Sequence, residues 1–266
     1  MTGIDHATLV LRLAAPLQSW GGPSRHNWRE TRPQPTKSGV LGLLAAAEGR
    51  DREASLTDLV GLQLGVRVDQ PGTLLRDYHT YSDYRGLPLL SAKANAKGQQ
   101  TRTAPPKYTG VTQRFYLQDA VFVAALRGPK ALMQSLEEAV RNPVFPLFLG
   151  RRSCPPTGPL SLGLRADARP EEVLKEVPWQ AGSHRRRLAR GSTVSLEATV
   201  EDPDGDQLAV DVPDTYDLKT GTRFGRRDVR HLWITVPTGR TQPAHTNMDT
   251  GTAGQSDHDP FTLLGW

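Results

Sequence analysis

The amino-acid sequence predicts an α+β protein in which a ferredoxin-like domain is followed by a smaller β-rich segment. Two β-α-β patterns follow one another along the first 165 residues, which is the order of elements in a ferredoxin-like fold. The 25 glycines and 21 prolines indicate many turns and long loops, so we do not expect a helical bundle or a coiled coil. The 266 residues are enough for one or two domains with a sizeable core.

The first β-α-β pattern starts at residues 8–14, where alternating and β-branched residues predict a strand. A loop rich in Pro and Gly covers residues 16–35 and leads to a helix capped by Thr36 or Ser38. This helix is apolar on nearly all sides, so we expect it to be buried. Alternation over residues 62–68 predicts a strand with one solvated face.

The second pattern is interrupted by a long segment without apolar periodicity. Strands are expected at residues 74–81 and 115–127, followed by a helix that starts at Pro129 and a short strand at 160–164. Residues 82–113 separate the first two of these strands. A stretch of this length without regular structure is functional or disordered in a compact domain.

Beyond residue 165 the sequence is richer in short strand patterns, and it becomes polar near its end. We expect strands at residues 193–200, 207–212 and 229–236. The chain is therefore divided into a domain over residues 1–165, a small β-rich segment over 166–238 and a flexible tail over 239–266.

The charge of the chain indicates an anionic partner. The 33 Lys and Arg minus 28 Asp and Glu give +5, and 26 of the basic residues are Arg. Arginine pairs with phosphate through a planar fork and stacks on bases. No signal peptide is expected, and the densest apolar stretch, residues 40–47, is far shorter than the roughly 20 residues of a membrane span. We therefore expect a cytoplasmic protein that does not bind a membrane.

Two short motifs are candidates for phosphate binding. Lys37 and Ser38 lie at the mouth of the first helix, where free N–H groups favour an anion. The glycines of a nucleotide P-loop are missing, so an ATP or GTP site is excluded. Gly150, Arg151 and Arg152 form a loop with Ser153 that could grip a sugar–phosphate backbone. An ordinary capped helix and a solvated turn are the alternatives.

Further basic stretches have less specific patterns. The segment 82–113 combines Lys and Arg with tyrosines, as expected for single-stranded nucleic acid, although a disordered surface insertion has the same composition. The densest basic run, residues 184–190, fits a solvated loop better than a specific site.

No metal or cofactor is expected. The seven His include no HExxH motif, and the single Cys154 fits a structural thiol better than a nucleophile. The acidic segment 202–206 fails the calcium-loop pattern and fits a hairpin turn. Asp77 and His79 could supply a general base.

Six blocks of sequence carry a resemblance to a known family. In chain order they are LRLAAPLQSWG (11–21), PTKSGVLGLL (35–44), LRDYHT (75–80), DYRG (83–86), YLQDA (116–120) and LGRRSCP (149–155). Together they resemble the CasD family of the type I-E CRISPR Cascade surveillance complex, in the repeat-associated mysterious protein superfamily.

The resemblance implies an RRM-related, ferredoxin-like domain with a thumb hairpin at about residues 78–113. It implies a subunit that holds the 5′ handle of the crRNA and caps the CasC backbone beside the large subunit CasA. CasB and CasE would be the other Cascade subunits, and target DNA would be reached indirectly, through the complex. Because CasE cuts the precursor RNA in these systems, no catalytic role is implied.

The family match assigns hypothetical roles to the candidate residues. Lys37, Ser38, Arg151 and Arg152 would seat phosphates, with Gly150 and Ser153 in the same loop. Trp20 and Phe148 would flank a flipped base, and Lys107, Tyr108 and Arg114 would fix the kink at the base of the thumb. The alternative is a CRISPR precursor-RNA endoribonuclease that uses Tyr78, His79 and Lys107.

Overall fold

The computed structural model describes residues 5–22, 27–82, 96–97, 109–217 and 223–239. The expected tail after residue 239 and the tip of the insertion lie outside these ranges, apart from Ala96 and Lys97. Lys107 and Tyr108 are also outside them.

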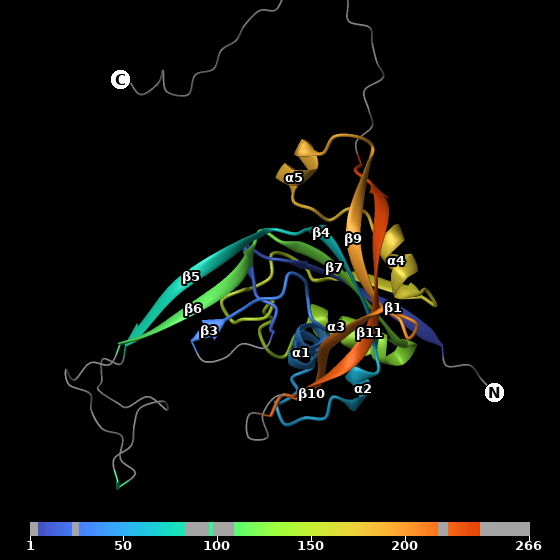
Figure 1. The fold of residues 1–266 in the computed structure, drawn as a ribbon. Helices are drawn as coiled ribbons and strands as arrows, with labels where there is room; N and C mark the ends of the chain where they lie inside the picture. Colours follow the sequence, from blue (N-terminus) through green and yellow to red (C-terminus); the bar gives the residue numbers. More distant parts are fainter. Residues whose placement is uncertain (1–4, 23–26, 83–95, 98–108, 218–222, 240–266) are drawn as a thin grey trace, which may run out of the picture.

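A seven-stranded antiparallel sheet forms the body of the protein, with the strand order β10-β11-β9-β4-β7-β1-β8. Its strands are β1 (His6–Ala14), β4 (Gln63–Gln70), β7 (Val121–Pro129), β8 (Ser161–Ala166), β9 (Thr193–Glu201), β10 (Gln207–Thr215) and β11 (Arg223–Pro237). The strands expected at residues 8–14, 62–68 and 160–164 and the three expected beyond residue 165 are therefore present in one sheet (Figure 1).

Two helices cover one face of this sheet. Helix α1 (Lys37–Ala47) connects β1 with β4, and helix α3 (Lys130–Arg141) connects β7 with β8. Thr36 is the N-cap of α1, and its side chain accepts a hydrogen bond from the N–H of Gly39. Pro129 is the N-cap of α3 instead of its first residue, because it still belongs to β7. The short helix α2 (Thr57–Val60) precedes β4.

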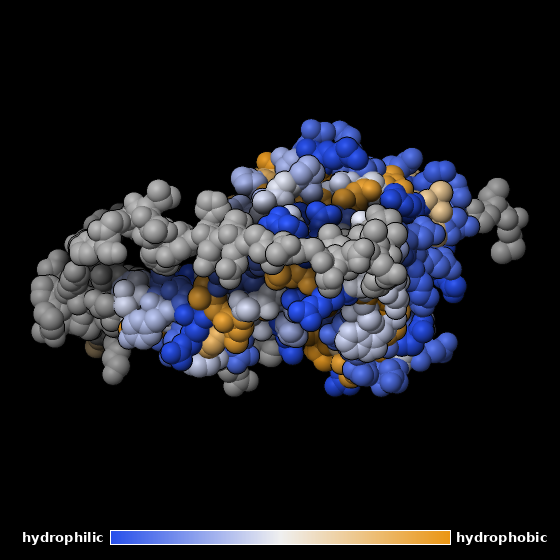
Figure 2. Space-filling view, turned by 90° about the horizontal axis from the view of Figure 1, so that it is seen from above, coloured by the Kyte–Doolittle hydropathy of each residue, from blue (hydrophilic) through white to orange (hydrophobic). Residues whose placement is uncertain are grey.

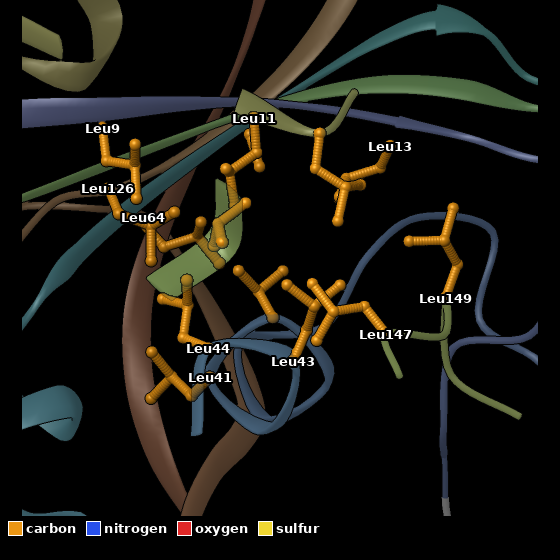
Figure 3. Close-up of a cluster of buried hydrophobic side chains, with 14 of the residues drawn as sticks. Leu9, Leu11, Leu13, Leu41, Leu43, Leu44, Leu64, Leu126, Leu147 and Leu149 are labelled. Carbon is orange, nitrogen blue, oxygen red and sulfur yellow. The ribbon is translucent and has the colours of Figure 1, made fainter. Parts of the chain in front are cut away.

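The main core lies between these helices and the sheet. Leucines of β1, α1, β4 and β7 meet there and exclude water, as Figure 3 shows. Burial of α1 on nearly all sides follows from its position, because the sheet, α3 and strand β10 all contact it. This burial supplies the driving force that fixes the helix against the sheet.

Helix α4 (Pro170–Glu176) covers the opposite face and closes a second core. Val173 and Leu174 of α4 pack there with Trp179 and with apolar residues of β9 and β11. A further helix, α5 (Ser183–Leu188), follows this core and contains no buried residue. The basic run at 184–190 is thus mostly a short solvated helix, where a loop was expected.

The C-terminal strands extend the central sheet instead of forming a sheet of their own. Strand β9 pairs with β4, with Val66 opposite Thr199, and β11 lies between β9 and β10. The expectation of a hairpin turn at residues 202–206 is therefore wrong, since the two strands that this segment joins are not neighbours.

A second, smaller sheet forms an arm that projects from the body (Figure 1). Strands β5 (Thr73–Ser82) and β6 (Thr109–Gln118) pair antiparallel, and the two-residue strands β2 (Leu17–Gln18) and β3 (Trp28–Arg29) join β6. The segment without periodicity thus ends at residue 108, because five of its residues belong to β6. The apolar run 115–127 is split into two strands at Asp119, which has a positive φ of 57°.

The face shown in Figure 2 is mostly hydrophilic. Figure 2 shows hydrophilic residues over much of the described surface, with smaller hydrophobic patches between them. Of the helices in the described ranges, none has the length and apolar character needed to cross a membrane.

Candidate nucleic-acid interface

The mouth of helix α1 is already occupied by carboxylates of the chain itself. The Lys37 side chain is 3% exposed, and its Nζ lies 2.9 Å from Oε1 of Glu201. The backbone N–H of Lys37 donates to Oδ2 of Asp211 at 2.8 Å. A helix N-terminus favours an anion, and here Asp211 provides it. The expectation that Lys37 seats a phosphate is therefore wrong.

Ser38 is equally engaged in structural contacts. Its Oγ lies 3.2 Å from Oγ1 of Thr36, and its carbonyl accepts a hydrogen bond from the hydroxyl of Tyr216. Burial raises the pKa of the Tyr216 phenol, so this donor stays protonated. The α1 mouth is thus a junction between the helix and the C-terminal strands.

A cavity of about 320 Å³ lies beside this junction, between residues 32–36 and strands β10 and β11. Arg227 on its wall is bound by Asp211, with Nε 2.7 Å from Oδ1 and Nη2 2.9 Å from Oδ2. Its guanidinium is therefore not available to a phosphate in this arrangement.

Trp20 belongs to the core. Its ring has no exposed surface, and its Nε1 donates to Oε1 of Gln18 at 3.1 Å. A Cβ at position 39 would approach Cε3 of Trp20 to 2.8 Å, so Gly39 leaves the space that the ring fills on α1. The expectation that Trp20 flanks a flipped base is wrong, because its faces are covered by protein.

The loop that follows residue 149 is fixed tightly to the segment after β1. Gly150 has a φ of +92°, and a Cβ there would lie 1.7 Å from the carbonyl oxygen of Ser19. The N–H of Ser19 donates to the Leu149 carbonyl at 3.1 Å, and the N–H of Leu149 donates to the Cys154 carbonyl at 2.8 Å. Glycine is required at position 150 for the loop to approach this closely.

Arg151 connects this loop to the arm. Its guanidinium donates to the carbonyls of Phe115 (3.0 Å) and Arg29 (2.8 Å), and it lies 4.7 Å from the ring centroid of Tyr116. Three of the groups that it binds belong to β3 and β6. Arg151 is therefore a structural clamp, whereas the expectation was a phosphate ligand.

The remaining loop residues are open to solvent. Arg152 and Ser153 are exposed, and Phe148 is half-buried. The Ser153 hydroxyl lies 3.5 Å from that of Tyr116. Cys154 is fully buried, and burial raises the pKa of its thiol, as expected for a structural cysteine. Arg152 thus remains the cation of this loop that can reach a ligand.

One face of the arm gathers exposed aromatic and basic side chains. Residues that are directly opposite in antiparallel strands share a face, and here Arg76 opposes Phe115 and Tyr78 opposes Gln113. Trp28 lies beside Gln113 in β3, with its ring centroid 4.9 Å from that of Phe115. The exposed fractions are 45% for Trp28 and 65% for Tyr78. We call Trp28, Arg76, Tyr78, Gln113 and Phe115 the arm face.

Sequence reasoning did not find most of the arm face. Alternation along β5 places Tyr78 and Arg76 on one side, so that pattern could have indicated both. Trp28 comes from an irregular loop and meets Phe115 only through the pairing of β3 with β6. No local signal predicts that contact.

The opposite face of the arm carries the groups considered for catalysis. Arg114 opposes Asp77 there, and Nδ1 of His79 lies 3.7 Å from Oδ2 of Asp77. Arg114 is half-buried, and its Nε donates to Oγ1 of Thr112 at 3.3 Å. Because Tyr78 and His79 are adjacent in a strand, they project from opposite faces and do not share one site.

The described residues contain no group of three or more His, Cys, Asp or Glu arranged to hold a metal ion. The chemistry of the arm face is instead that of stacking and hydrogen bonding. Exposed aromatic rings interleaved with arginine are the features that bind unpaired bases and the phosphates between them.

Comparison with known proteins identifies the family. Residues 8–237 match a family model described as CRISPR-associated protein (Cas_Cas5). The chain is 41% identical over 184 residues to the CRISPR system Cascade subunit CasD of Escherichia coli (strain K12), covering 62% of this chain and 75% of that protein.

Two solved structures have the same fold. A chain of a CRISPR RNA-guided surveillance complex superposes with a TM-score of 0.70 at 36% identity, covering 86% of this chain and 91% of that chain. A structure described as a Cas protein superposes with a TM-score of 0.61 at 36% identity, covering 85% of this chain and 94% of that chain. The resemblance to CasD in the sequence is thereby confirmed. The chain belongs to the CRISPR-associated Cas5 family.

Proposed function

We propose that this protein is the subunit of a type I-E Cascade complex that holds the 5′ handle of the crRNA. It would cap the CasC backbone beside CasA, in a particle that also contains CasB and CasE and meets target DNA through its guide. The relative from Escherichia coli is named as a Cascade subunit, and a chain of a CRISPR RNA-guided surveillance complex has the same fold.

The observation that carries this proposal is the arm face. Handle RNA is single-stranded, and such RNA is recognised by bases that stack on aromatic rings while cations bind the phosphates. Trp28 and Tyr78 present rings to solvent, and Arg76 is exposed on the same face, two residues from Tyr78 along β5. Gln113 lies between the two rings, and its buried Oε1 has no hydrogen-bond partner in the described part of the chain.

The scaffold supports the same proposal. The four strands β4, β7, β1 and β8 are adjacent in that order, with α1 and α3 as their connections. We interpret this as an RRM-related, ferredoxin-like domain, and we interpret β5 and β6 as the stem of its thumb. Arg151 fixes the loop that carries Arg152 against β3 and β6, on the side of β6 from which Tyr116 projects.

The test uses two aromatic variants and one matched control. Trp28→Ala and Tyr78→Ala should each weaken binding of a labelled handle RNA by about 5- to 150-fold, the loss expected for one stacked base. Leu74→Ala is the control, because Leu74 is 65% exposed and lies on the same face of β5, but its side chain has no aromatic ring. Equal affinities for all three variants and the parent protein would contradict the proposal.

We propose no catalytic role for this chain. The endoribonuclease alternative would need His79 as a base, and its nearest carboxylate, Asp77, supports that role only by proximity. Incubation of the purified protein with a labelled repeat hairpin should give no specific cleavage. Cleavage that His79→Ala abolishes would establish the enzyme instead.

A further inference from the structure

Helix α5 presents an unusual concentration of positive charge. Arg185, Arg186 and Arg187 occupy successive positions of α5, and Arg190 follows two residues after its end. All four side chains are exposed, and no residue of the helix is buried. We call Arg185, Arg186, Arg187 and Arg190 the α5 patch.

Most of this charge is not neutralised by the described part of the chain. Several other arginines on the body have carboxylate partners, such as Asp58 for Arg50, Glu137 for Arg141 and Asp202 for Arg230. Arg185, Arg186 and Arg190 form no salt bridge with any residue in the described ranges. Cations held together without counter-charges raise the local potential and attract an anionic partner.

A neighbouring arginine extends the positive surface. The guanidinium of Arg12 donates to the carbonyls of Gln180 (3.5 Å) and Thr157 (3.4 Å), beside the segment that leads to α5. Burial lowers the pKa of Arg12, and the charge of Arg186 lowers it further. Arg12 therefore adds to the positive potential of this surface, although Asp69 offsets part of its charge.

The short helix is fastened to the body at its start. Trp179 and Ala181 are buried in the second core, and the N–H of Gly182 donates to Oε1 of Gln70 at 3.2 Å. The N–H of Gln180 donates to Oδ2 of Asp69 at 2.5 Å. These contacts hold the α5 patch in one orientation, so binding does not have to order it.

The position and composition of α5 favour binding to the phosphate backbone of a nucleic acid over binding to its bases. The segment 183–190 has no Trp, Tyr or Phe, so it offers no ring on which an unpaired base could stack. It follows the core on the α4 side of the sheet, whereas Leu149 and Cys154, which flank the Arg152 loop, belong to the core on the α1 side. A six-residue helix is about 9 Å long and would face roughly five charges of duplex DNA.

We propose that the α5 patch binds the phosphate backbone of the duplex DNA that the crRNA-containing complex encounters. This inference rests on the proposed function, because it places the protein in a complex that meets DNA. It adds a second, sequence-independent contact on a surface separate from the handle site.

The test compares two triple variants in the assembled complex. Arg185→Gln, Arg186→Gln and Arg190→Gln together remove three charges from the patch, and Arg52→Gln, Arg141→Gln and Arg169→Gln remove three exposed charges elsewhere. Duplex DNA affinity is measured over a range of salt concentrations, and crRNA content is measured for each complex. The patch variant should lower the salt slope by up to about three units, with its crRNA content unchanged.

Three results would overturn the inference: an unchanged slope in the patch variant, an equal decrease in the control variant, or loss of crRNA from the patch variant alone. Failure of the handle proposal would be recognised separately. It would appear as wild-type handle affinity in Trp28→Ala and Tyr78→Ala, which are changes on the arm and not in the α5 patch.

Discussion

Arg67 and Asp69 form an ion pair with no exposed surface on either side chain. The two residues are separated by one position in β4, with Nε 2.7 Å from Oδ1 and Nη2 2.9 Å from Oδ2. The remaining donors of Arg67 bind the carbonyls of Leu174, Val177 and Pro178. Burying two charges is costly, and these additional hydrogen bonds are what offsets the cost. The pair thereby fastens the chain between α4 and α5 to the sheet.

Removing one member of this pair should strongly destabilise the fold. Asp69→Asn leaves the Arg67 charge buried without its counter-ion, and we expect a loss of about 3–5 kcal/mol in the free energy of unfolding. Urea denaturation measures it. Asp58→Asn is the matched control, because Asp58 pairs with Arg50 at a side-chain exposure of 44% and should cost less than about 1 kcal/mol. Similar losses for the two variants would show that burial of the pair has no special cost.

Lys37 should be a stability residue and not an RNA ligand. Lys37→Met removes the charge-assisted bond to Glu201 and should lower the free energy of unfolding by about 2 kcal/mol. Lys175→Met is the control, since Lys175 is 54% exposed and its pair with Glu171 should contribute less than about 0.5 kcal/mol. Handle affinity should be unchanged in both variants. A loss of affinity without a loss of stability in Lys37→Met would restore its role as a phosphate ligand.

The two adjacent arginines of the 149–153 loop should behave differently. Arg151→Gln should lower stability, because the guanidinium holds carbonyls of β3 and β6. Arg152→Gln should leave the melting temperature unchanged and reduce the salt slope of handle binding by about 0.7 units. Calorimetry and binding titrations over a salt series separate the two effects. The reverse assignment of effects would contradict the clamp role of Arg151.

Gly150 should not tolerate a side chain. Its φ of +92° and the 1.7 Å approach of a Cβ to the Ser19 carbonyl both oppose Gly150→Ala. Gly158→Ala is the control, because Gly158 has a φ of +78° and nothing within 4 Å of its Cβ position. The control should cost about 1–2 kcal/mol from the backbone alone, and Gly150→Ala should cost clearly more. Equal melting temperatures would show that the loop can move away from Ser19.

Stability should fall with acid through the contacts of Arg230. The pKa of Glu171 is lowered mainly by a hydrogen bond from Lys175, and the positive charge of Arg230 lowers it further. The pKa of Asp202 is lowered mainly by a hydrogen bond from the N–H of Asp204, and a hydrogen bond from Arg230 lowers it further. A lowered carboxylate pKa gives stability that is present above the unfolded-state value near 4 and is lost as the pH falls through the folded-state value. Melting temperatures between pH 6 and 3 should decline less steeply in Arg230→Gln than in the parent protein. Parallel curves would show that these contacts do not contribute.

Elements with local signals could be predicted from the sequence. Alternation along β1, β4 and β9, the Thr36 cap of α1 and the amphipathic pattern of α3 are each contained within about a dozen residues. Such patterns report which face of an element is buried, whatever covers it. The six family blocks then identified the relatives. Residues 109–113 at the start of β6 were not predicted as a strand. They lie on the projecting arm, where no core imposes an alternating apolar pattern on the sequence.

Which of the candidate residues are free to bind depends on contacts that form only in the folded protein. Lys37 meets Glu201 across 164 positions of sequence, and Trp28 meets Phe115 only because β3 pairs with β6. The covering of Trp20 likewise depends on where α1 lies against it. A charged or aromatic residue has the same local pattern whether it is satisfied inside the protein or open to a ligand. Its availability depends on the long-range partners that the fold brings to it, and these are not encoded near it in the chain.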